Sequence, residues 1–370
     1  MKWENLINRI FSSLFLVFLC GMAVIFLVSP KAKYSIAERR HLQDMPELTW
    51  EGIKDASYMQ DLESYLLEHF PFREAFRGMK AFFVYDILLQ KENNDIYVVN
   101  GHAAKLEYPM NETSIMKAAE KMSALQEKYF SNADVYYAIV PDKNYFLAKE
   151  NGYPSLDYEN LEALMQENLD GMTYIPIWDT LTVEDYYTTD THWRQEHLGE
   201  TVERLAEYMG FSDYVMTEFE QREIPDFYGV YYGQSALALP AESMYYLTNE
   251  VIDAATHFNV ETNQTKPLYE LDLLEDEALM DKYNIYLGGA VAIQTITSPK
   301  AAGDGRLIIF RDSFTSSLAP LLTNAYQEIV LIDTRYVSAG FLGNFVDFTD
   351  ADVLFLYNPL VLNNSTMLKN

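Results

Sequence analysis

The sequence predicts an α/β protein with a mainly parallel sheet flanked by helices and preceded by one N-terminal transmembrane helix. Three observations predict this class. From about residue 76 onward, short apolar runs alternate with amphipathic segments, as in βα units that feed a parallel sheet. Near the N-terminus, a run without a charge is long enough to span a bilayer. The composition, 49% hydrophobic and 22% charged, is typical of a globular protein and excludes disorder or a fibrous repeat.

The uncharged apolar run extends from Ile10 to Ser29, about the length that crosses the hydrocarbon core at ~1.5 Å per residue. Pro30 and lysines follow it where a signal peptide would have a small-residue cleavage site, so we predict an uncleaved anchor. Lys2 and Arg9 precede the run and more basic residues follow it, which mildly favours a cytoplasmic main domain. Long domains translocate regardless of such charges. The site motifs below therefore decide the orientation, and they favour an extracytoplasmic domain.

The chain divides by composition into four parts. We predict a cytoplasmic tail at 1–9, the anchor at 10–29, a polar connector with short helices at 30–75 and the main domain at 76–370. Within the main domain the pattern weakens into acidic and aromatic stretches at about 214–290, which we interpret as an insertion or cap. The sequence shows no internal repeat and no low-complexity linker, so one large domain is favoured over two.

The elements of the main domain follow from periodicity. The segment 112–129 repeats apolar residues at helical spacing behind Asn111, and this predicts a capped surface helix. A second helix is predicted from Leu198 to Met209, with Gly210 as its C-terminal cap. Nearly continuous apolar runs predict core strands covered on both faces, at 135–141, 307–310, 329–332 and 353–357.

Charge and cysteine content exclude several function classes. The chain has 27 basic and 55 acidic residues and a net charge of −28, which argues against nucleic-acid binding because phosphate contacts need clustered Lys and Arg. The single cysteine, Cys20, excludes an intrachain disulfide and a cysteine metal site. Aromatic residues make up 14% of the chain. We expect most of them to pack the core, and stacking on sugar faces is the alternative.

One histidine has a distinctive setting. The segment 185–193, DYYTTDTHW, places Asp190 two residues before His192. Because a helix is predicted directly afterwards, we expect His192 at a loop-to-helix junction, where side chains are presented and not buried. The alternative is that His192 only caps that helix. A metal site is disfavoured because two histidines five apart do not share a helical face; its candidate ligands would be Asp190, His192, Glu196, His197 and Glu200.

A serine lies where a predicted strand meets a predicted helix. In the segment 306–320, RLIIFRDSFTSSLAP, Asp312 and Ser313 follow the apolar strand. Such a turn places the hydroxyl at the carboxyl end of the sheet, with backbone amides nearby to hold an oxyanion. A simple N-cap is the alternative for Ser313. Taken together with the Asp-x-His segment, the chain contains a nucleophile, a base and an orienting carboxylate.

These segments resemble a known family. TDTHW resembles the Asp-His-His-Trp signature of the bacterial DHHW family, and RDSFTSSLAPLL followed by EIVLIDTRYV resembles its Lys-Asp-Ser-Phe segment and Asp-x-Arg-Tyr strand. The connector sequences SIAERRHLQDMP and YLLEHFPFRE look like the segments before the catalytic domain in this family and in the related alginate O-acetylation proteins of the SGNH hydrolase-like superfamily. The similarity runs in order from about Ser35 to Asn358.

The resemblance implies an SGNH-like catalytic domain in which Ser313 is the nucleophile, His192 the general base and Asp190 the orienting carboxylate. Two departures stand out. Thr191 replaces the first histidine of the signature, and Arg311 occupies a position where related proteins have Gly or Lys. We expect Arg311 to affect the oxyanion turn or the substrate preference.

Two further residues are weaker candidates. The oxyanion Asn of SGNH proteins has no secure match, and Asn358 is our candidate for it, with a role as a turn residue as the alternative. Arg335 is a candidate for substrate positioning, with a plain ion pair as the alternative.

The resemblance also implies a function, O-acetyl transfer to a cell-surface or exported polysaccharide through an acetyl-serine. No acetyl-CoA site is evident, so we expect no cofactor and a membrane-bound O-acyltransferase as the partner that supplies acetyl groups. Two alternatives stay open, an acetylesterase with the same triad and a non-catalytic glycan-binding protein of the cell envelope. The net charge of −28 makes an acidic glycan a poor ligand unless a local basic patch exists.

Overall fold

The computed structural model describes residues 2–35, 37–130, 133–276, 279 and 281–369. The chain forms two compact units. One comprises Met1–Asn93 and Ala236–Ala238, and the other comprises Asn94–Ser235 and Leu239–Asn370. From the sequence we place the start of the main domain at about residue 76, which lies in a helix of the first unit. Every candidate site residue lies in the second unit.

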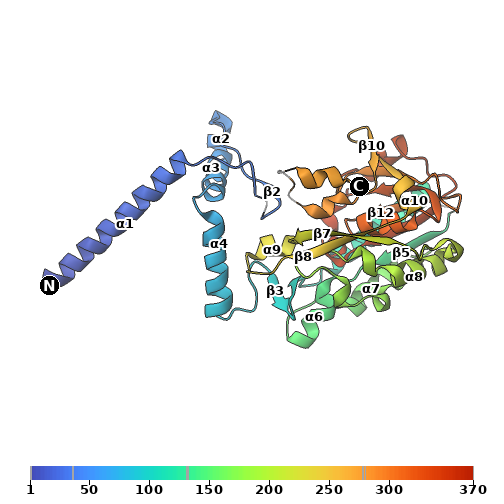
Figure 1. The fold of residues 1–370 in the computed structure, drawn as a ribbon, viewed down its shortest axis with the longest axis horizontal. Coiled ribbons are helices and arrows are strands. Elements are labelled where there is room, and N and C mark those ends of the chain that lie inside the picture. Colours follow the sequence, from blue (N-terminus) through green and yellow to red (C-terminus); the bar gives the residue numbers. More distant parts are fainter. Residues whose placement is uncertain (1, 36, 131–132, 277–278, 280, 370) are drawn as a thin grey trace. The chain divides into compact units, whose positions relative to one another are not determined.

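The first unit is helical. Its N-terminal helix, α1 (Lys2–Val28), contains a stretch from Leu6 to Val28 that is long and apolar enough to cross a membrane (Figure 1). By length and composition this stretch suits a membrane anchor or a signal sequence. The other elements are β1 (Tyr34–Ser35), β2 (Arg40–His41), α2 (Trp50–Lys54), α3 (Ser57–Glu68), α4 (Arg73–Phe82) and the π-helical turn η1 (Phe83–Ile87).

The second unit is built on an eight-stranded sheet with the order β10-β9-β11-β13-β12-β14-β5-β6. The five strands from β13 to β6 run parallel, and β10, β9 and β11 are antiparallel additions at one edge. The strands are β5 (Val135–Ile139), β6 (Thr173–Tyr174), β9 (Thr256–Asn259), β10 (Gln264–Pro267), β11 (Ile293–Thr297), β12 (Gly305–Arg311), β13 (Tyr326–Ile332) and β14 (Asp352–Tyr357). The predicted α/β class with a mainly parallel sheet is therefore confirmed, as are its four core strands.

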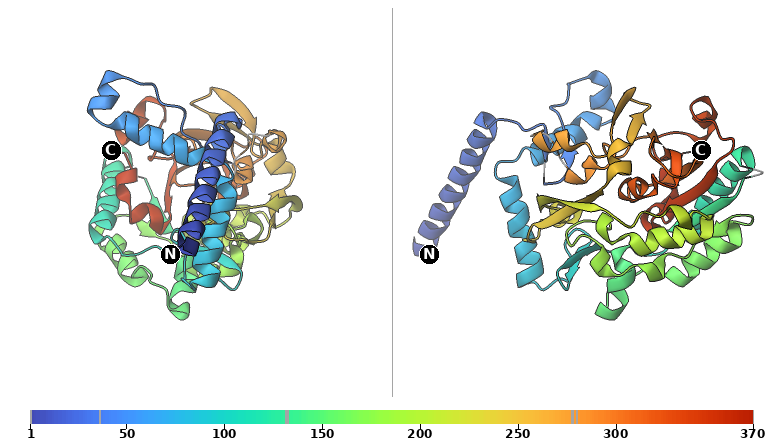
Figure 2. Two further views of the ribbon diagram at one scale, coloured as in Figure 1. Left: turned by 90° about the vertical axis from the view of Figure 1, so that its left-hand side faces the viewer. Right: turned by 45° about the vertical axis from the view of Figure 1, so that its right-hand side comes forward.

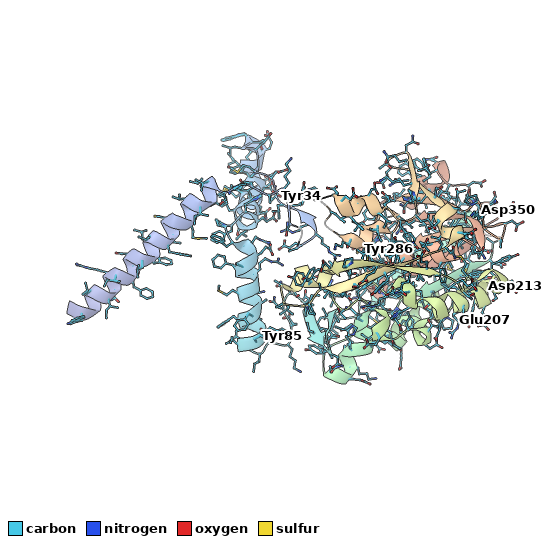
Figure 3. The ribbon with its side chains drawn as sticks, in the orientation of Figure 1. Tyr34, Tyr85, Glu207, Asp213, Tyr286 and Asp350 are labelled. Carbon is cyan, nitrogen blue, oxygen red and sulfur yellow. The ribbon has the colours of Figure 1, made fainter. Side chains whose placement is uncertain are left out.

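The central strands are apolar along their whole length because both of their faces are covered. In β12, Leu307 to Phe310 are all fully buried, as expected for a strand between two layers. The ring of Phe310 stacks on that of Phe355 in the neighbouring strand β14, with ring centroids 4.5 Å apart. Figure 3 shows the dense side-chain interior, in which the labelled Tyr286 is buried, whereas Glu207 and Asp213 are exposed.

The two predicted helices form as expected. Helix α5 (Glu112–Tyr129) begins after Asn111, whose side-chain oxygen accepts a hydrogen bond from the Ser114 amide at 3.1 Å. Helix α8 (Gly199–Met209) ends at Gly210, which adopts φ 79°, a conformation that favours glycine. Both views of Figure 2 show α5 beside the C-terminal segment, where the Ser114 hydroxyl bonds to the Leu362 carbonyl.

Shorter elements complete the second unit. Its other helices are α6 (Lys143–Asn151), α7 (Tyr158–Asn168), α9 (Val230–Ser235), α10 (Glu250–Ala254), α11 (Thr315–Leu318) and α12 (Pro359–Leu362). Its short helical turns are η2 (Trp178–Thr180), η3 (Val183–Asp185), η4 (Gln195–His197), η5 (Ser212–Tyr214), η6 (Leu271–Glu275), η7 (Lys282–Ile285), η8 (Ala319–Leu322), η9 (Ala339–Asn344) and η10 (Ser365–Met367).

Apart from Ala236–Ala238, the segment 214–290 belongs to the second unit. It supplies β9 and β10 to the edge of the central sheet. It also forms an antiparallel ribbon of β7 (Glu220–Phe227) and β8 (Glu242–Thr248). A separate hairpin, β3 (Ile96–Val99) and β4 (His102–Lys105), lies near the start of the unit. The β7–β8 ribbon matters for the site, because residues at and between its strands hold the Asp-x-His segment.

Candidate active site

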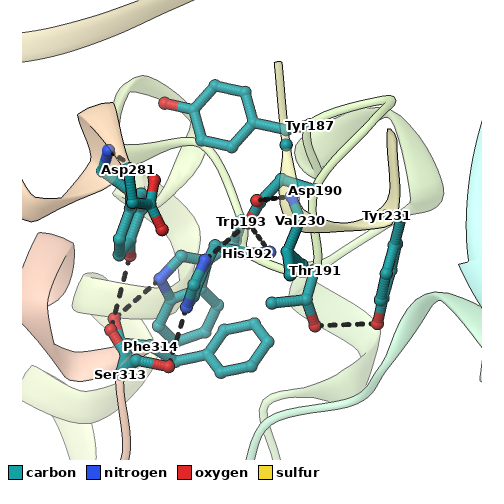
Figure 4. Close-up of polar contacts among 12 residues, drawn as sticks. Tyr187, Asp190, Thr191, His192, Trp193, Val230, Tyr231, Asp281, Ser313 and Phe314 are labelled. Carbon is teal, nitrogen blue, oxygen red and sulfur yellow. Dashed lines mark hydrogen bonds and ion pairs between the residues drawn. The ribbon is translucent and has the colours of Figure 1, made fainter. Parts of the chain in front are cut away.

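The structure brings the serine, histidine and aspartate together. Ser313 follows β12 after Asp312, at the carboxyl end of the parallel strands. His192 Nε2 lies 2.7 Å from Ser313 Oγ, and His192 Nδ1 lies 2.6 Å from Asp190 Oδ1 (Figure 4). Asp190 is fully buried, His192 is 6% exposed and Ser313 is partly exposed. The three groups thus form a hydrogen-bonded series that leads from a buried carboxylate to an accessible hydroxyl.

The surroundings of His192 correct one expectation. Its ring is buried, and α8 begins only at Gly199, with η4 in between, so His192 does not lie exposed at the start of that helix. The N-cap of α8 is Leu198, and the alternative that His192 only caps this helix is therefore wrong. Ser313 is likewise not the N-cap of α11, since Phe314 occupies that position.

The disfavoured metal cluster does not assemble among the residues that the structure describes. There, no group of three His, Cys, Asp or Glu side chains is arranged to hold a metal ion. His197, a member of the alternative set, is bonded instead to Asp185, with 3.0 Å between Nδ1 and Oδ1.

Asp190 is fixed by backbone amides. Its Oδ1 also accepts a hydrogen bond from the His192 amide at 3.0 Å, and its Oδ2 accepts one from the Val230 amide at 2.7 Å. The second bond requires a close backbone approach at Gly229, where an added Cβ would lie 2.2 Å from the Thr189 carbonyl carbon. Glycine is therefore needed at 229 to bring the Val230 amide to the carboxylate.

A carboxylate from β8 holds the loop that carries Asp190. Glu242 accepts hydrogen bonds from the amides of Thr188 and Thr189, both at 2.8 Å, and from the Thr189 hydroxyl at 2.7 Å. It also pairs with Arg194 at 2.8 Å. The loop is closed by a hydrogen bond from the Tyr187 amide to the His192 carbonyl. The sequence gives no local signal for Glu242, because it lies about fifty positions downstream in a weakly patterned segment.

A buried lysine supports the same loop from the other side. Lys143, at the start of α6, is 2% exposed, and its ammonium group donates to the carbonyls of Tyr187 at 2.9 Å and Thr188 at 3.2 Å. Burial lowers the pKa of Lys143 to about 7, although the carboxylates of Asp190 and Glu242 act in the opposite direction. The loop backbone is thus bonded from α6 and from β8.

Aromatic rings enclose the imidazole. The ring of Tyr283, in η7, stacks on His192 with centroids 3.9 Å apart and an interplanar angle of 7°. Burial raises the pKa of Tyr283, and its hydroxyl donates to Ser317 Oγ at 2.9 Å. Phe314 approaches the imidazole from another direction, with ring centroids 5.1 Å apart. These contacts leave His192 little rotational freedom, and sequence reasoning missed Tyr283 because it is remote in the chain.

The two weaker candidates bond elsewhere. Asn358 caps α12 through its side-chain oxygen and donates its amide group to the Val140 carbonyl at 3.0 Å. Its backbone amide donates to Asp312 Oδ2 at 2.7 Å, which joins it to the serine turn only indirectly. Arg335 forms an ion pair with Asp333 at 2.6 Å. The alternatives of a turn residue and an ion pair thus describe the contacts that these two side chains make.

The two departures from the family pattern also have structural roles. Thr191 accepts a hydrogen bond from the Tyr231 hydroxyl at 2.9 Å (Figure 4). Arg311 is fully buried, and burial lowers its pKa. Its guanidinium group donates to Ser316 Oγ at 2.7 Å and to Gln294 Oε1 at 2.8 Å. Arg311 therefore ties the helix after Ser313 to strand β11, on the far side of β13.

Comparison with known proteins places this geometry on a known fold. No family model and no curated protein matches the chain. Among solved structures, a DHHW family protein from Eubacterium siraeum matches with a TM-score of 0.59 and 17% identity, over 75% of this chain and 97% of that one. PatB1 of Bacillus cereus, carrying a sulfonyl adduct, matches with a TM-score of 0.55 and 16% identity, over 74% and 100% of the two chains. The O-acetyltransferase domain of Pseudomonas putida AlgJ matches with a TM-score of 0.41 and 12% identity, over 72% and 92%.

The first two of these matches show that the chain has an SGNH-like α/β fold. The chain shares it with the DHHW family protein and PatB1, and the predicted resemblance to the DHHW family is confirmed at the level of the fold.

Proposed function

We propose that this chain is a membrane-anchored, extracytoplasmic O-acetyltransferase that modifies a cell-surface or exported polysaccharide through an acetyl-serine intermediate. One observation carries the proposal, namely the hydrogen bonds that join Ser313, His192 and Asp190 at 2.7 and 2.6 Å. A hydroxyl, an imidazole and a carboxylate in this order are the groups that nucleophilic acyl transfer requires. The DHHW-like motifs and the fold shared with a DHHW family protein and PatB1 support it.

The first half-reaction loads the enzyme. Ser313 Oγ attacks the acetyl carbonyl carbon of the donor while His192 Nε2 takes the hydroxyl proton. Asp190 holds the imidazole through Nδ1 and stabilises the imidazolium that forms. The tetrahedral intermediate then expels the donor oxygen, which receives the proton from His192. The products are acetyl-Ser313 and the deacylated donor.

The second half-reaction transfers the acetyl group. A sugar hydroxyl gives its proton to His192 Nε2 and attacks the acetyl carbon, and Ser313 Oγ leaves and regains a proton from His192. Asn358 stays a candidate oxyanion donor. In that role its side-chain amide would give up its hydrogen bond to the Val140 carbonyl and donate to the oxyanion. Arg335 stays a candidate for substrate positioning. Attack by water in place of the sugar would make the same site an acetylesterase.

The proposed location and partner follow from the anchor. Residues 10–29 would fix the chain in the cell membrane with the second unit outside, where cytosolic acetyl-CoA is absent. A membrane-bound O-acyltransferase would then supply the acetyl group, and no cofactor is needed by the triad. The long apolar helix α1 supports the anchoring part of this proposal.

A complementation experiment tests the function. The gene is deleted, and the strain is complemented with wild type, Ser313→Ala or the control Ser243→Ala, which changes a half-buried serine on β8 whose hydroxyl donates to Glu223. Ester-linked acetate on the surface polysaccharide is then measured. We expect deletion and Ser313→Ala to abolish acetylation and Ser243→Ala to restore it. Full acetylation with Ser313→Ala would contradict catalysis, and increased acetylation on deletion would indicate an esterase.

A further inference from the structure

We propose that α4 and η1 form an interfacial segment, which lies on the membrane surface and contacts the bilayer with a row of exposed apolar side chains. The inference goes beyond the acetyl-transfer chemistry, and it rests on the proposed anchoring of α1. It concerns the first unit alone.

An apolar row runs along this segment and is exposed to solvent in the described structure. Phe76, Met79 and Phe83 recur at the three- and four-residue spacing of one helix face, and they are 39%, 63% and 52% exposed. Phe72 before α4 and Ile87 at the end of η1 are 64% and 54% exposed. A contiguous row of this kind marks a surface that another phase or partner covers.

The polar side of α4 is already occupied. Arg73 and Arg77 both pair with Glu38, at 2.6 and 3.0 Å, and Glu38 also pairs with Arg40 at 2.7 Å. Burial alone would raise the pKa of Glu38, but these guanidinium groups hold it below its usual value. Lys80 donates to Asn93 Oδ1 at 2.8 Å. These contacts direct one face of the helix toward its own unit and leave the apolar row facing away.

Charge favours a lipid surface over a protein surface as the occupant. Residues 73–87, which form α4 and η1, contain three basic and two acidic side chains, a net charge of +1, in a chain whose net charge is −28. Anionic headgroups repel most of such a chain but attract the basic side chains of this segment. Phenylalanine on one face and Lys or Arg on the other is the pattern of helices that lie in the interface.

Continuity along the chain favours the same occupant. Helix α4 belongs to the same compact unit as α1, the element that can cross a membrane. The second unit begins at Asn94, shortly after η1. An interfacial α4 therefore keeps the chain at the bilayer up to the start of the unit that carries Ser313, where an integral membrane protein would present the acetyl group.

Depth-dependent quenching on the full chain tests the inference. The protein is reconstituted in vesicles of phosphatidylcholine and phosphatidylglycerol in equal parts. On a Cys20→Ser background, Met79→Cys and Phe83→Cys each carry an environment-sensitive NBD label. Glu74→Cys, on the polar side of the same helix, is the matched control, and wild type labelled at Cys20 reports on the span itself. Doxyl lipids quench from the bilayer and iodide quenches from water.

We expect labels at 79 and 83 to be blue-shifted, to lose fluorescence with doxyl lipid and to resist iodide, and the label at 74 to show the reverse. Iodide quenching at 79 and 83 would overturn the inference. Shielding from both quenchers would overturn it as well, because a protein surface would then cover the row. A Cys20 label that doxyl lipid quenches separates either failure from failure of the anchor. If doxyl lipid does not reach Cys20, the anchor and the inference both fall.

Discussion

The position of Asp190 shows how the site is set at the scale of single residues. Its two oxygens accept hydrogen bonds from the imidazole Nδ1, the His192 amide and the Val230 amide. A carboxylate held in this way fixes the tautomer in which Nδ1 carries the proton, so that Nε2 can accept from Ser313. The backbone of two separate segments, 190–192 and 229–230, therefore defines which imidazole nitrogen faces the serine.

Replacing this carboxylate by its amide is the first prediction. Asp190→Asn keeps the size of the side chain but reverses the preferred tautomer and removes the charge that balances an imidazolium. We expect a loss of about 10⁴-fold in kcat for an acetyl ester, with an unchanged circular dichroism spectrum. The control is Asp213→Asn, at an exposed position. Activity within a few-fold of wild type would show that Asp190 does not orient His192.

Gly229 gives the second prediction. An alanine there would place its Cβ 2.2 Å from the Thr189 carbonyl carbon, so the backbone must shift and the Val230 amide leaves Asp190. We expect Gly229→Ala to lower kcat and to reduce the free energy of unfolding by about 1–3 kcal/mol. Denaturant titration measures the second quantity. The control is Gly199→Ala, where no atom lies within 4 Å of the added Cβ, and equal behaviour of the two variants would contradict the account.

At the scale of elements, strand β8 and helix α6 hold the Asp-x-His loop between them. Glu242, the first residue of β8, bonds to two loop amides, and Lys143 bonds to two loop carbonyls. Neither side chain bonds to Ser313 or His192. In the proposed reaction both would therefore be positioning residues that act through the geometry of the loop.

Glu242 supplies a prediction at this scale. Glu242→Gln keeps the shape but removes the charge that four donors share, which weakens several charge-assisted hydrogen bonds. We expect kcat to fall about 10- to 100-fold, equivalent to about 1–3 kcal/mol, with little change in KM. The matched control is Glu223→Gln on the paired strand β7, where the Glu223 carboxylate accepts a hydrogen bond from the Ser243 hydroxyl. A change in KM alone would assign Glu242 to substrate binding.

Lys143 predicts a pH dependence of stability. Its pKa is lowered by burial to about 7, from 10.5, so between these values the unfolded chain binds a proton that the folded chain does not. The contribution of Lys143 to the free energy of unfolding should therefore rise with pH across this window, by up to about 1.4 kcal/mol per pH unit. Denaturant titrations of wild type and Lys143→Met from pH 7 to 10 measure the difference. Lys149→Met, exposed on the same helix, is the control, and a difference independent of pH would refute the prediction.

At the scale of the whole molecule, the elements that the sequence predicted are those that depend on local information. The core strands and the Asn111 cap depend on short runs, and burial of both faces of β12 explains why its run is continuous. Aromatic residues such as Trp193 and Tyr286 are fully buried in the core, whereas others, such as Tyr336 and Phe341, are exposed. Within the site, Ser313 lies at the carboxyl edge of the sheet and His192 lies in the Asp-x-His loop, and the two side chains meet there.

The missed features depend on contacts between distant segments. Glu242, Gly229 and Tyr283 all come from 214–290, where the periodicity is weak. The burial of His192 was not predictable either, because the local sequence indicates a loop but not that a tyrosine ring stacks on it. Sequence reasoning therefore proposed Ser313, His192 and Asp190 as the reacting groups, and the structure adds the residues that hold these three side chains in place.

The central claim is that Ser313 carries the acetyl group. The most direct test is intact and peptide mass spectrometry of the full chain in detergent after incubation with a chromogenic acetyl ester, with Ser313→Ala, His192→Ala and Ser243→Ala in parallel. We expect an adduct of about 42 Da on Ser313 in wild type and Ser243→Ala, and no adduct in the other two variants. No adduct and no ester turnover in any form would contradict it and favour a non-catalytic glycan-binding protein.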